Sequence, residues 1–150
     1  MNIQIRQISI GDADMVATMI ADLLDEFAPG AGPDAASLIP TARAVLAQPT
    51  VTALLAEADG LPAGLAMLND CAAVYAGGAF GEITELYVRP DLRSQGIAAQ
   101  LLAEAGRIGR IRGWRRIEVG APEQPVWART LAFYRREGFV EVGPRLKMPL

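Results

Sequence analysis

Carboxylates, tyrosines and arginines are the side chains with which this sequence could do chemistry. Of its 150 residues, none is histidine and only one, Cys71, is cysteine. Ser-His-Asp and Cys-His nucleophile systems, histidine-ligated zinc and Cys-x-x-Cys sites are therefore excluded, and we expect no metal site. A lone cysteine usually behaves as a small apolar residue, so Cys71 is not expected to be a nucleophile. Proton transfer is left to carboxylates, tyrosines, arginines, Lys147 and the backbone.

The most informative stretch runs from Glu82 to Leu102 and reads EITELYVRPDLRSQGIAAQLL. Its β-branched and aromatic start predicts a strand over 82–88, and the run RSQGIA at 93–98 then opens a helix. Gly96 allows a ligand to approach the backbone closely, and the small Ala98 keeps that approach open. The free amide groups and the dipole of the first helical turn then form an anion site that suits a pyrophosphate. The spacing fits neither the dinucleotide fingerprint nor a P-loop.

Two segments carry a resemblance to a known family. LYVRPDLRSQGIAAQLL resembles the acetyl-CoA-binding motif of the GNAT superfamily of acyl-CoA-dependent N-acyltransferases, whose core is Arg/Gln-x-x-Gly-x-Gly/Ala. Arg93, Gly96 and Ala98 match that core. Downstream, TLAFYRREGF at 130–139 resembles the family's helix-to-strand signature.

The second signature matches at Tyr134, Gly138 and Phe139 and departs from the family pattern at two positions. The family often has alanine where this chain has Thr130. It often has asparagine, which helps to hold the cofactor arm, where this chain has Trp127. The resemblance therefore does not extend to the contact made by that asparagine.

The resemblance implies acetyl-CoA as cosubstrate and direct transfer of acetyl to a primary amine in a ternary complex. It implies that the pyrophosphate is held by Arg93 and by the amides of the residues that follow, namely Ser94, Gln95, Gly96, Ile97 and Ala98. The pantetheine arm would pair with the backbone of Leu86, Tyr87 and Val88, and an N–H group of Tyr87 or Val88 would face the oxyanion. Tyr134 is the family's usual general acid for the leaving thiolate.

Three glutamates compete for the role of general base. A free amine must lose a proton before attack, and a carboxylate can take it directly or through a water molecule. Glu82 and Glu85 lie on the strand predicted at 82–88. Simple alternation places Glu85 on the face of Ile83 and Tyr87 and Glu82 on the other, although the family often bulges this strand. Glu118 on the next strand and solvent-linked deprotonation are the alternatives.

The net charge of −3 conceals a division along the chain. Residues 1–88 hold two basic and eleven acidic side chains, whereas residues 89–150 hold twelve basic and six acidic ones. The basic half suits a phosphate-bearing ligand and the acidic half a cationic one, while overall acidity argues against nucleic acid. By the resemblance, the acceptor binds near Asp22, Asp25, Glu26 and Asp34, so we expect a cationic small-molecule or peptide amine, with a solvated acidic surface as the alternative.

Five arginines lie close together in the sequence at 107–116, namely Arg107, Arg110, Arg112, Arg115 and Arg116. Cations there complement the C-terminus of a helix, so a solvated face is expected. A contact to the 3′-phosphate of the nucleotide is the alternative.

Hydrophobic periodicity predicts an α/β fold over 1–150. Strands are expected at 3–8, 51–57, 63–69, 82–88, 116–120, 139–142 and 146–148, and helices at 12–27, 34–47, 94–112 and 125–137. This order, β-α-α-β-β-β-α-β-α-β-β, predicts a mixed sheet. It also resembles the element order of the GNAT superfamily, and the resemblance implies a GNAT-like mixed central sheet flanked by helices. Only the later strand-helix-strand unit has to be parallel.

The expected setting is cytoplasmic. The start MNIQIRQISIGDAD lacks the basic segment and apolar run of a signal peptide. The weakly hydrophobic stretch at 71–81 is too short to span a membrane. The resemblance also allows a homodimer. A non-catalytic acyl-CoA-binding or sensing module is the main alternative function, and an acetylating toxin that acts on charged tRNA is disfavoured by the acidic balance.

Overall fold

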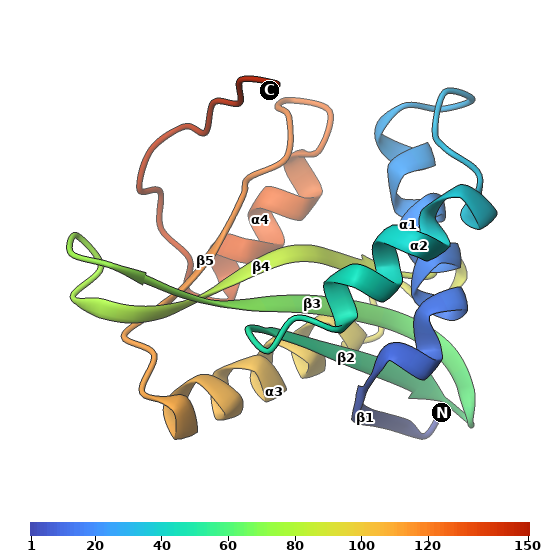
Figure 1. Ribbon diagram of the computed structural model, residues 1–150, viewed down its shortest axis with the longest axis horizontal. Coiled ribbons are helices and arrows are strands. Elements are labelled where there is room, and N and C mark those ends of the chain that lie inside the picture. The colour runs from blue at the N-terminus through green and yellow to red at the C-terminus, as the bar shows by residue number, and fades with distance from the viewer.

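A mixed sheet in the order β1-β2-β3-β4-β5 organises the computed structural model, which describes residues 1–150 (Figure 1). The strands are β1 (Ile3–Ile8), β2 (Val51–Ala58), β3 (Leu61–Ala73), β4 (Gly78–Val88) and β5 (Ile117–Val119). All neighbours are antiparallel except β4 and β5. A parallel pair needs a crossover, which α3 (Ile97–Arg112) provides. The predicted mixed α/β sheet with flanking helices is confirmed.

Helices cover both faces of the sheet (Figure 1). The first face carries α1 (Ala13–Phe27) and α2 (Ala35–Leu46), and the second carries α3. Short 3-10 turns, η1 (Ile10–Asp12) and η2 (Pro90–Leu92), precede α1 and α3, and α4 (Ala128–Arg136) follows β5. Apolar residues at helical spacing explain the packing, because they bury one stripe of each helix. No helix combines the length and the apolar character needed to cross a bilayer.

A β-bulge interrupts β4 at Thr84. Opposite it on β3, Met67 pairs with Glu85 and the next residue, Leu68, pairs with Ile83. Thr84 therefore has no partner across the ladder. Such an extra residue shifts every following side chain to the opposite face of the strand.

The bulge corrects the assignment of faces made by simple alternation. Ile83 belongs to the apolar cluster under α3, whereas Tyr87 belongs to the cluster under α1 and α2. Glu85 therefore does not share a face with Ile83. Glu82 pairs with Asn69, two residues from the partner of Glu85, so the two glutamates lie on the same face and not on opposite ones.

The strands predicted at 139–142 and 146–148 are wrong. Residues 140–150 make no backbone–backbone hydrogen bond, and Val140, Leu146 and Leu150 are exposed. The neighbouring edge strand β5 has only three residues, which is too short a ladder for another strand to pair with. A side-chain contact, the ion pair of Arg145 with Glu82, connects this C-terminal segment to β4 instead. Figure 1 shows this segment running outside the sheet.

Several predicted boundaries also move. The helix predicted from 94 begins at Ile97, because Ser94 and Gly96 have positive φ angles of 62° and 84°, which no helical residue adopts. The helix predicted at 125–137 spans 128–136. The strands predicted at 63–69 and 82–88 belong to a longer hairpin, since residues 70–73 pair with 78–81.

Trp114 fixes the C-terminal end of α3 against the sheet. Its indole Nε1 donates to Asp70 Oδ1 on β3 at 2.7 Å. Glycines leave room for the ring: a Cβ atom would lie 2.2 Å from it at Gly81 on β4 and 2.5 Å from it at Gly109 on α3. Real Cβ atoms do not approach an aromatic ring so closely, so both positions require glycine.

Gly109→Ala should lower the free energy of unfolding by about 1 to 3 kcal/mol, because the new methyl group overpacks the ring of Trp114. Gly106→Ala on the same helix is the matched control, since its nearest neighbour is the flexible end of Arg110 at 3.4 Å. That variant should gain about 0.5 to 1 kcal/mol from helix propensity. Urea unfolding measures both values, and a shift of the same sign in the two variants would contradict the role of Trp114.

Candidate active site

The main cavity opens where β4 diverges from β5. β5 pairs only with Gly81, Glu82 and Ile83, so β4 has no strand neighbour on that side from Thr84 onward. The cavity has a volume of about 1240 Å³ and is lined by β4, the loop before α3 and the first residues of α3, residues 119–122, α4 and the end of α1. Pockets for drug-sized molecules usually measure about 300 to 1,000 Å³, so this cavity can hold a longer ligand or two ligands together.

A row of unpartnered amide groups marks one end of the cavity. The N–H groups of Ser94, Gln95, Gly96, Ile97 and Ala98 make no hydrogen bond within the protein. They precede or begin the 16-residue helix α3, whose dipole adds positive potential there. Nothing lies within 4 Å of a Cβ atom built on Gly96, so a ligand has access to this backbone. Of these residues, only Gln95 lies outside the cavity lining.

The Arg93 side chain is bound within the protein. Its Nε donates to the carbonyl oxygen of Val88 at 2.9 Å, and its guanidinium forms an ion pair with Glu26 at the end of α1. The same group lies 5.9 Å from the ring centroid of Tyr87. Arg93 thus ties the loop to β4 and α1. In this arrangement the loop amides, and not the guanidinium, are the groups left free for an anion.

Glu85 is the predicted base candidate that lines the cavity. Its carboxylate accepts a hydrogen bond from the hydroxyl of Thr84, the bulge residue. The bulge and the adjacent hydroxyl therefore orient the carboxylate beside the open edge of β4. Thr84 was not singled out in the sequence, because a bulge depends on the register of two strands.

The other two glutamates lie outside the cavity lining and are held by neighbours. Arg145 Nη1 lies 2.8 Å from Glu82 Oε1. Glu118 accepts hydrogen bonds from the Tyr75 hydroxyl at 3.0 Å and from Arg116 Nε at 2.8 Å. The structure therefore brings Glu82 and Glu118 together as neighbours on β4 and β5, but not with Glu85 at the cavity.

Tyr134 lines the cavity from α4 and is only 6% exposed. Its ring lies between those of Phe133 and Phe139, with centroid distances of 5.6 and 5.4 Å. Burial raises the pKa of Tyr134 to about 12. The phenol is therefore protonated at neutral pH, so it can donate a proton but cannot serve as a base.

The acids expected to hold a cationic acceptor are not gathered at the cavity. Asp25 accepts a hydrogen bond from the amide of Gly30, and Asp34 accepts one from the amide of Ser37. Asp22 is exposed outside the cavity lining. Glu26 alone lines the cavity, and it is paired with Arg93.

An aromatic contact joins the two sides of the cavity. Phe27 at the end of α1 and Trp127 before α4 meet edge to face, with centroids 5.2 Å apart. Phe27 nevertheless remains 50% exposed. The contact links distant segments of the chain, so no local pattern in the sequence could have indicated it.

Cys71 lies on β3, outside the cavity lining. Burial raises the pKa of its thiol, and the nearby carboxylates of Glu82, Asp70 and Glu118 raise it further. A thiol with a raised pKa is a poor nucleophile at neutral pH.

Solved structures similar to this fold include several that are named as acetyltransferases. Ribosomal-protein-alanine N-acetyltransferase from Brucella melitensis biovar Abortus 2308 is 23% identical over 100% of both chains, with a TM-score of 0.78. Aminoglycoside acetyltransferase HMB0005 from an uncultured soil metagenomic sample is 22% identical over 100% of this chain and 99% of its own, with a TM-score of 0.78. A protein of Arthrobacter sp. FB24 assigned to the acetyltransferases is 31% identical over 98% of this chain and 91% of its own, with a TM-score of 0.75.

The sequence itself matches a family model. Residues 49–141 fit the acetyltransferase (GNAT) domain, and this range includes β2, β3, β4, β5, α3 and α4. No curated protein matches the chain. The family match covers more than half of the chain and contains both segments on which the resemblance was based, so the chain belongs to the GNAT acetyltransferase family.

Proposed function

We propose that the protein transfers acetyl from acetyl-CoA directly to a primary amine, in a ternary complex without a covalent acyl-enzyme. The observation that carries this proposal is the row of free amides at 94–98, which opens into a cavity beside the unpaired edge of β4. The names of two similar structures also support it, because those proteins are an N-acetyltransferase for a ribosomal-protein alanine and an acetyltransferase for aminoglycosides.

The residues present fit acetyl-CoA. The amides of Ser94 to Ala98 provide a dense set of donors for a pyrophosphate. The β4 backbone from Leu86 to Val88 has no strand neighbour on the β5 side, so an amide-containing arm can pair with it as an added strand would. Trp127 lines the same cavity in place of the family's frequent asparagine, so the contact to this arm at that position is apolar.

The transfer requires one proton to leave the amine and one to reach the leaving sulfur. When bound, acetyl-CoA supplies the acetyl group as an activated thioester. Glu85 accepts the amine proton, directly or through water, because its carboxylate is the predicted base that lines the cavity. A backbone N–H group of Tyr87 or Val88 stabilises the charge that develops on the acetyl oxygen.

Tyr134 protonates the leaving sulfur. Its raised pKa keeps the phenol neutral, and its buried position beside the cavity limits competition from water. The proton it gives up is replaced from solvent after the products leave. No protein nucleophile is needed in this scheme, which agrees with the position of Cys71 outside the cavity lining.

The proposed acceptor is a cationic amine of a small molecule or peptide. The acidic excess of residues 1–88 attracts such a molecule over a distance, and Glu26 is the acid of α1 that lines the cavity. Its partner Arg93 would have to share Glu26 with the incoming ammonium group.

The experiment that tests the proposed function is calorimetric titration of the protein with acetyl-CoA, followed by an amine screen for CoA release. We expect micromolar binding that Gly96→Glu weakens at least about tenfold, because its carboxylate faces the pyrophosphate. Gly96→Asn is the matched control, since asparagine tolerates the positive φ of 84° without adding charge. Absence of binding would refute the proposal, and binding without transfer to any amine would indicate a non-catalytic acyl-CoA-binding module.

Glu85→Gln should lower kcat about 100-fold or more, because an amide cannot take the amine proton. Glu82→Gln and Glu118→Gln are the matched controls, since they remove the same charge from glutamates outside the cavity lining. Their kcat should stay within about threefold of the wild-type value. Steady-state assays at saturating acetyl-CoA measure the three variants, and a larger loss in Glu82→Gln would move the base to that residue.

Tyr134→Phe should lower kcat about 100-fold with unchanged binding of acetyl-CoA.

Tyr134→Phe should also change how the free energy of unfolding depends on pH in the alkaline range. The folded pKa of about 12 exceeds the unfolded value near 10, so this stabilisation is complete below pH 10 and is lost as the pH rises through 12. Between pH 9 and 12, the wild type should therefore lose about 2 to 3 kcal/mol of unfolding free energy more than Tyr134→Phe. Equal losses in urea unfolding would show that the phenol is not buried.

A further inference from the structure

The arginines of this chain divide into those with an acidic partner and those without one. Nine form ion pairs with aspartate or glutamate. The four that form none are Arg110, Arg115, Arg129 and Arg136. An arginine without a carboxylate partner keeps its donors available for an external anion.

Two of these four arginines line the main cavity. Arg129 and Arg136 lie on α4, and neither side chain makes a hydrogen bond to another residue. Phe133 lies four residues after Arg129 and three before Arg136, so the three share one face of the helix. Phe133 packs against the apolar cluster that contains the start of α3, and the Arg136 guanidinium lies 6.0 Å from its ring centroid. This face of α4 therefore borders the same cavity as the helix start that carries the free amides.

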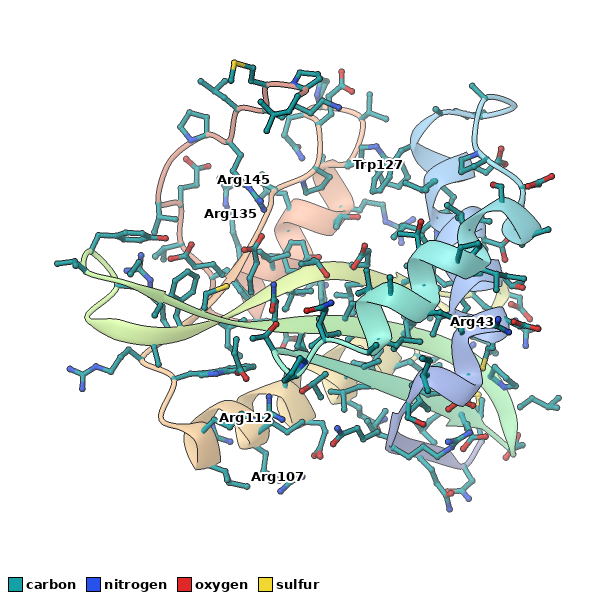
Figure 2. All side chains as sticks on the ribbon, viewed as in Figure 1. Arg43, Arg107, Arg112, Trp127, Arg135 and Arg145 are labelled. Atoms are coloured by element: carbon teal, nitrogen blue, oxygen red, sulfur yellow. The ribbon has the colours of Figure 1, made fainter.

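The other two unpaired arginines lie far from that helix start. Arg110 and Arg115 line a separate hollow of about 190 Å³ beside Trp114. A helix rises about 1.5 Å per residue, so Arg110 lies about 20 Å along α3 from Ile97. Figure 2 shows their neighbours Arg107 and Arg112 at this C-terminal half of α3, away from Trp127 before α4.

We propose that Arg129 and Arg136 bind the 3′-phosphate of CoA and make the site selective for the 3′-phosphorylated cofactor. This inference rests on the proposed function. The 3′-phosphate is joined to the pyrophosphate through a single ribose, so its binding group must lie close to residues 94–98. The arginines at the far end of α3, named above as the alternative contact, are too distant for that.

The charge balance of the cavity supports the same assignment. Four arginines line it, but Arg93 is paired with Glu26 and Arg145 with Glu82. Arg129 and Arg136 are therefore the cavity cations that a doubly charged phosphate can engage without breaking an ion pair. Two guanidinium groups on one helix face can each offer paired donors to phosphate oxygens.

Calorimetric titration with CoA and with 3′-dephospho-CoA tests this inference. We expect wild-type protein to bind CoA at least about tenfold more tightly than dephospho-CoA. In the double variant Arg129→Ala/Arg136→Ala, the affinity for CoA should fall to that for dephospho-CoA, while the affinity for dephospho-CoA stays unchanged. Thermal melts accompany each titration to show that the variants are folded.

Two control variants match the change in charge. Arg135→Ala removes a neighbouring arginine of α4 that pairs with Glu141 outside the cavity lining. Arg110→Ala/Arg115→Ala removes the two unpaired arginines at the other end of α3. Both should keep the wild-type preference for CoA.

The outcomes separate the inference from the proposed function. If wild-type protein binds both nucleotides equally, or if Arg110→Ala/Arg115→Ala abolishes the preference, the inference is overturned and the proposed function stands. An equal loss of affinity for both nucleotides in Arg129→Ala/Arg136→Ala would also overturn it, because it would indicate a general field effect. Binding of neither nucleotide to the wild type would overturn both.

Discussion

The early separation of β4 from β5 is the constraint on which the rest of the site depends. Only three residues of each strand pair, and beyond Ile83 the β4 edge is left open. Open backbone groups next to a cavity need partners, which water or an extended ligand can provide. The bulge at Thr84 begins where the pairing with β5 stops, and it turns both Glu85 and Tyr87 away from the face of Ile83. The end of the β4–β5 pairing thus creates the opening, and the bulge in the β3–β4 ladder places a carboxylate beside it.

The helix start of α3 depends on the same separation. β4 ends at Val88, and the chain must leave the sheet before it can return as the parallel strand β5. The positive φ angles of Ser94 and Gly96 delay the helix until Ile97 and expose a row of amides to the cavity. Arg93 holds this loop in place by bonding back to the carbonyl of Val88. The open strand edge and the row of free amides therefore face one cavity.

Ion pairing then determines which charges remain available. Glu82 is held by Arg145 of the C-terminal tail, and Glu26 is held by Arg93. Exposed pairs of this kind contribute about 0 to 1 kcal/mol to stability, so their main effect is to orient side chains and to neutralise charge. Glu85 lines the cavity with only a hydroxyl partner, and Arg129 and Arg136 line it with no acidic partner. The chemistry and the ligand contacts proposed above rest on these unpaired groups.

The sequence by itself determined the mixed α/β class, most of the helices and strands, the position of the glycine-containing loop before α3 and the family. These features depend on local periodicity and on short motifs, such as Gly96 before a helix, which the neighbouring residues dictate. The final two strands were predicted wrongly, because a strand needs a partner edge and β5 is too short to provide one.

Only the tertiary structure decided how the site is assembled. The shared face of Glu82 and Glu85 follows from a register shift between β3 and β4. The contact of Phe27 with Trp127 and the ion pair of Arg145 with Glu82 join segments far apart in the chain. Register and long-range pairing depend on several elements packing together, and no local pattern of residues encodes them.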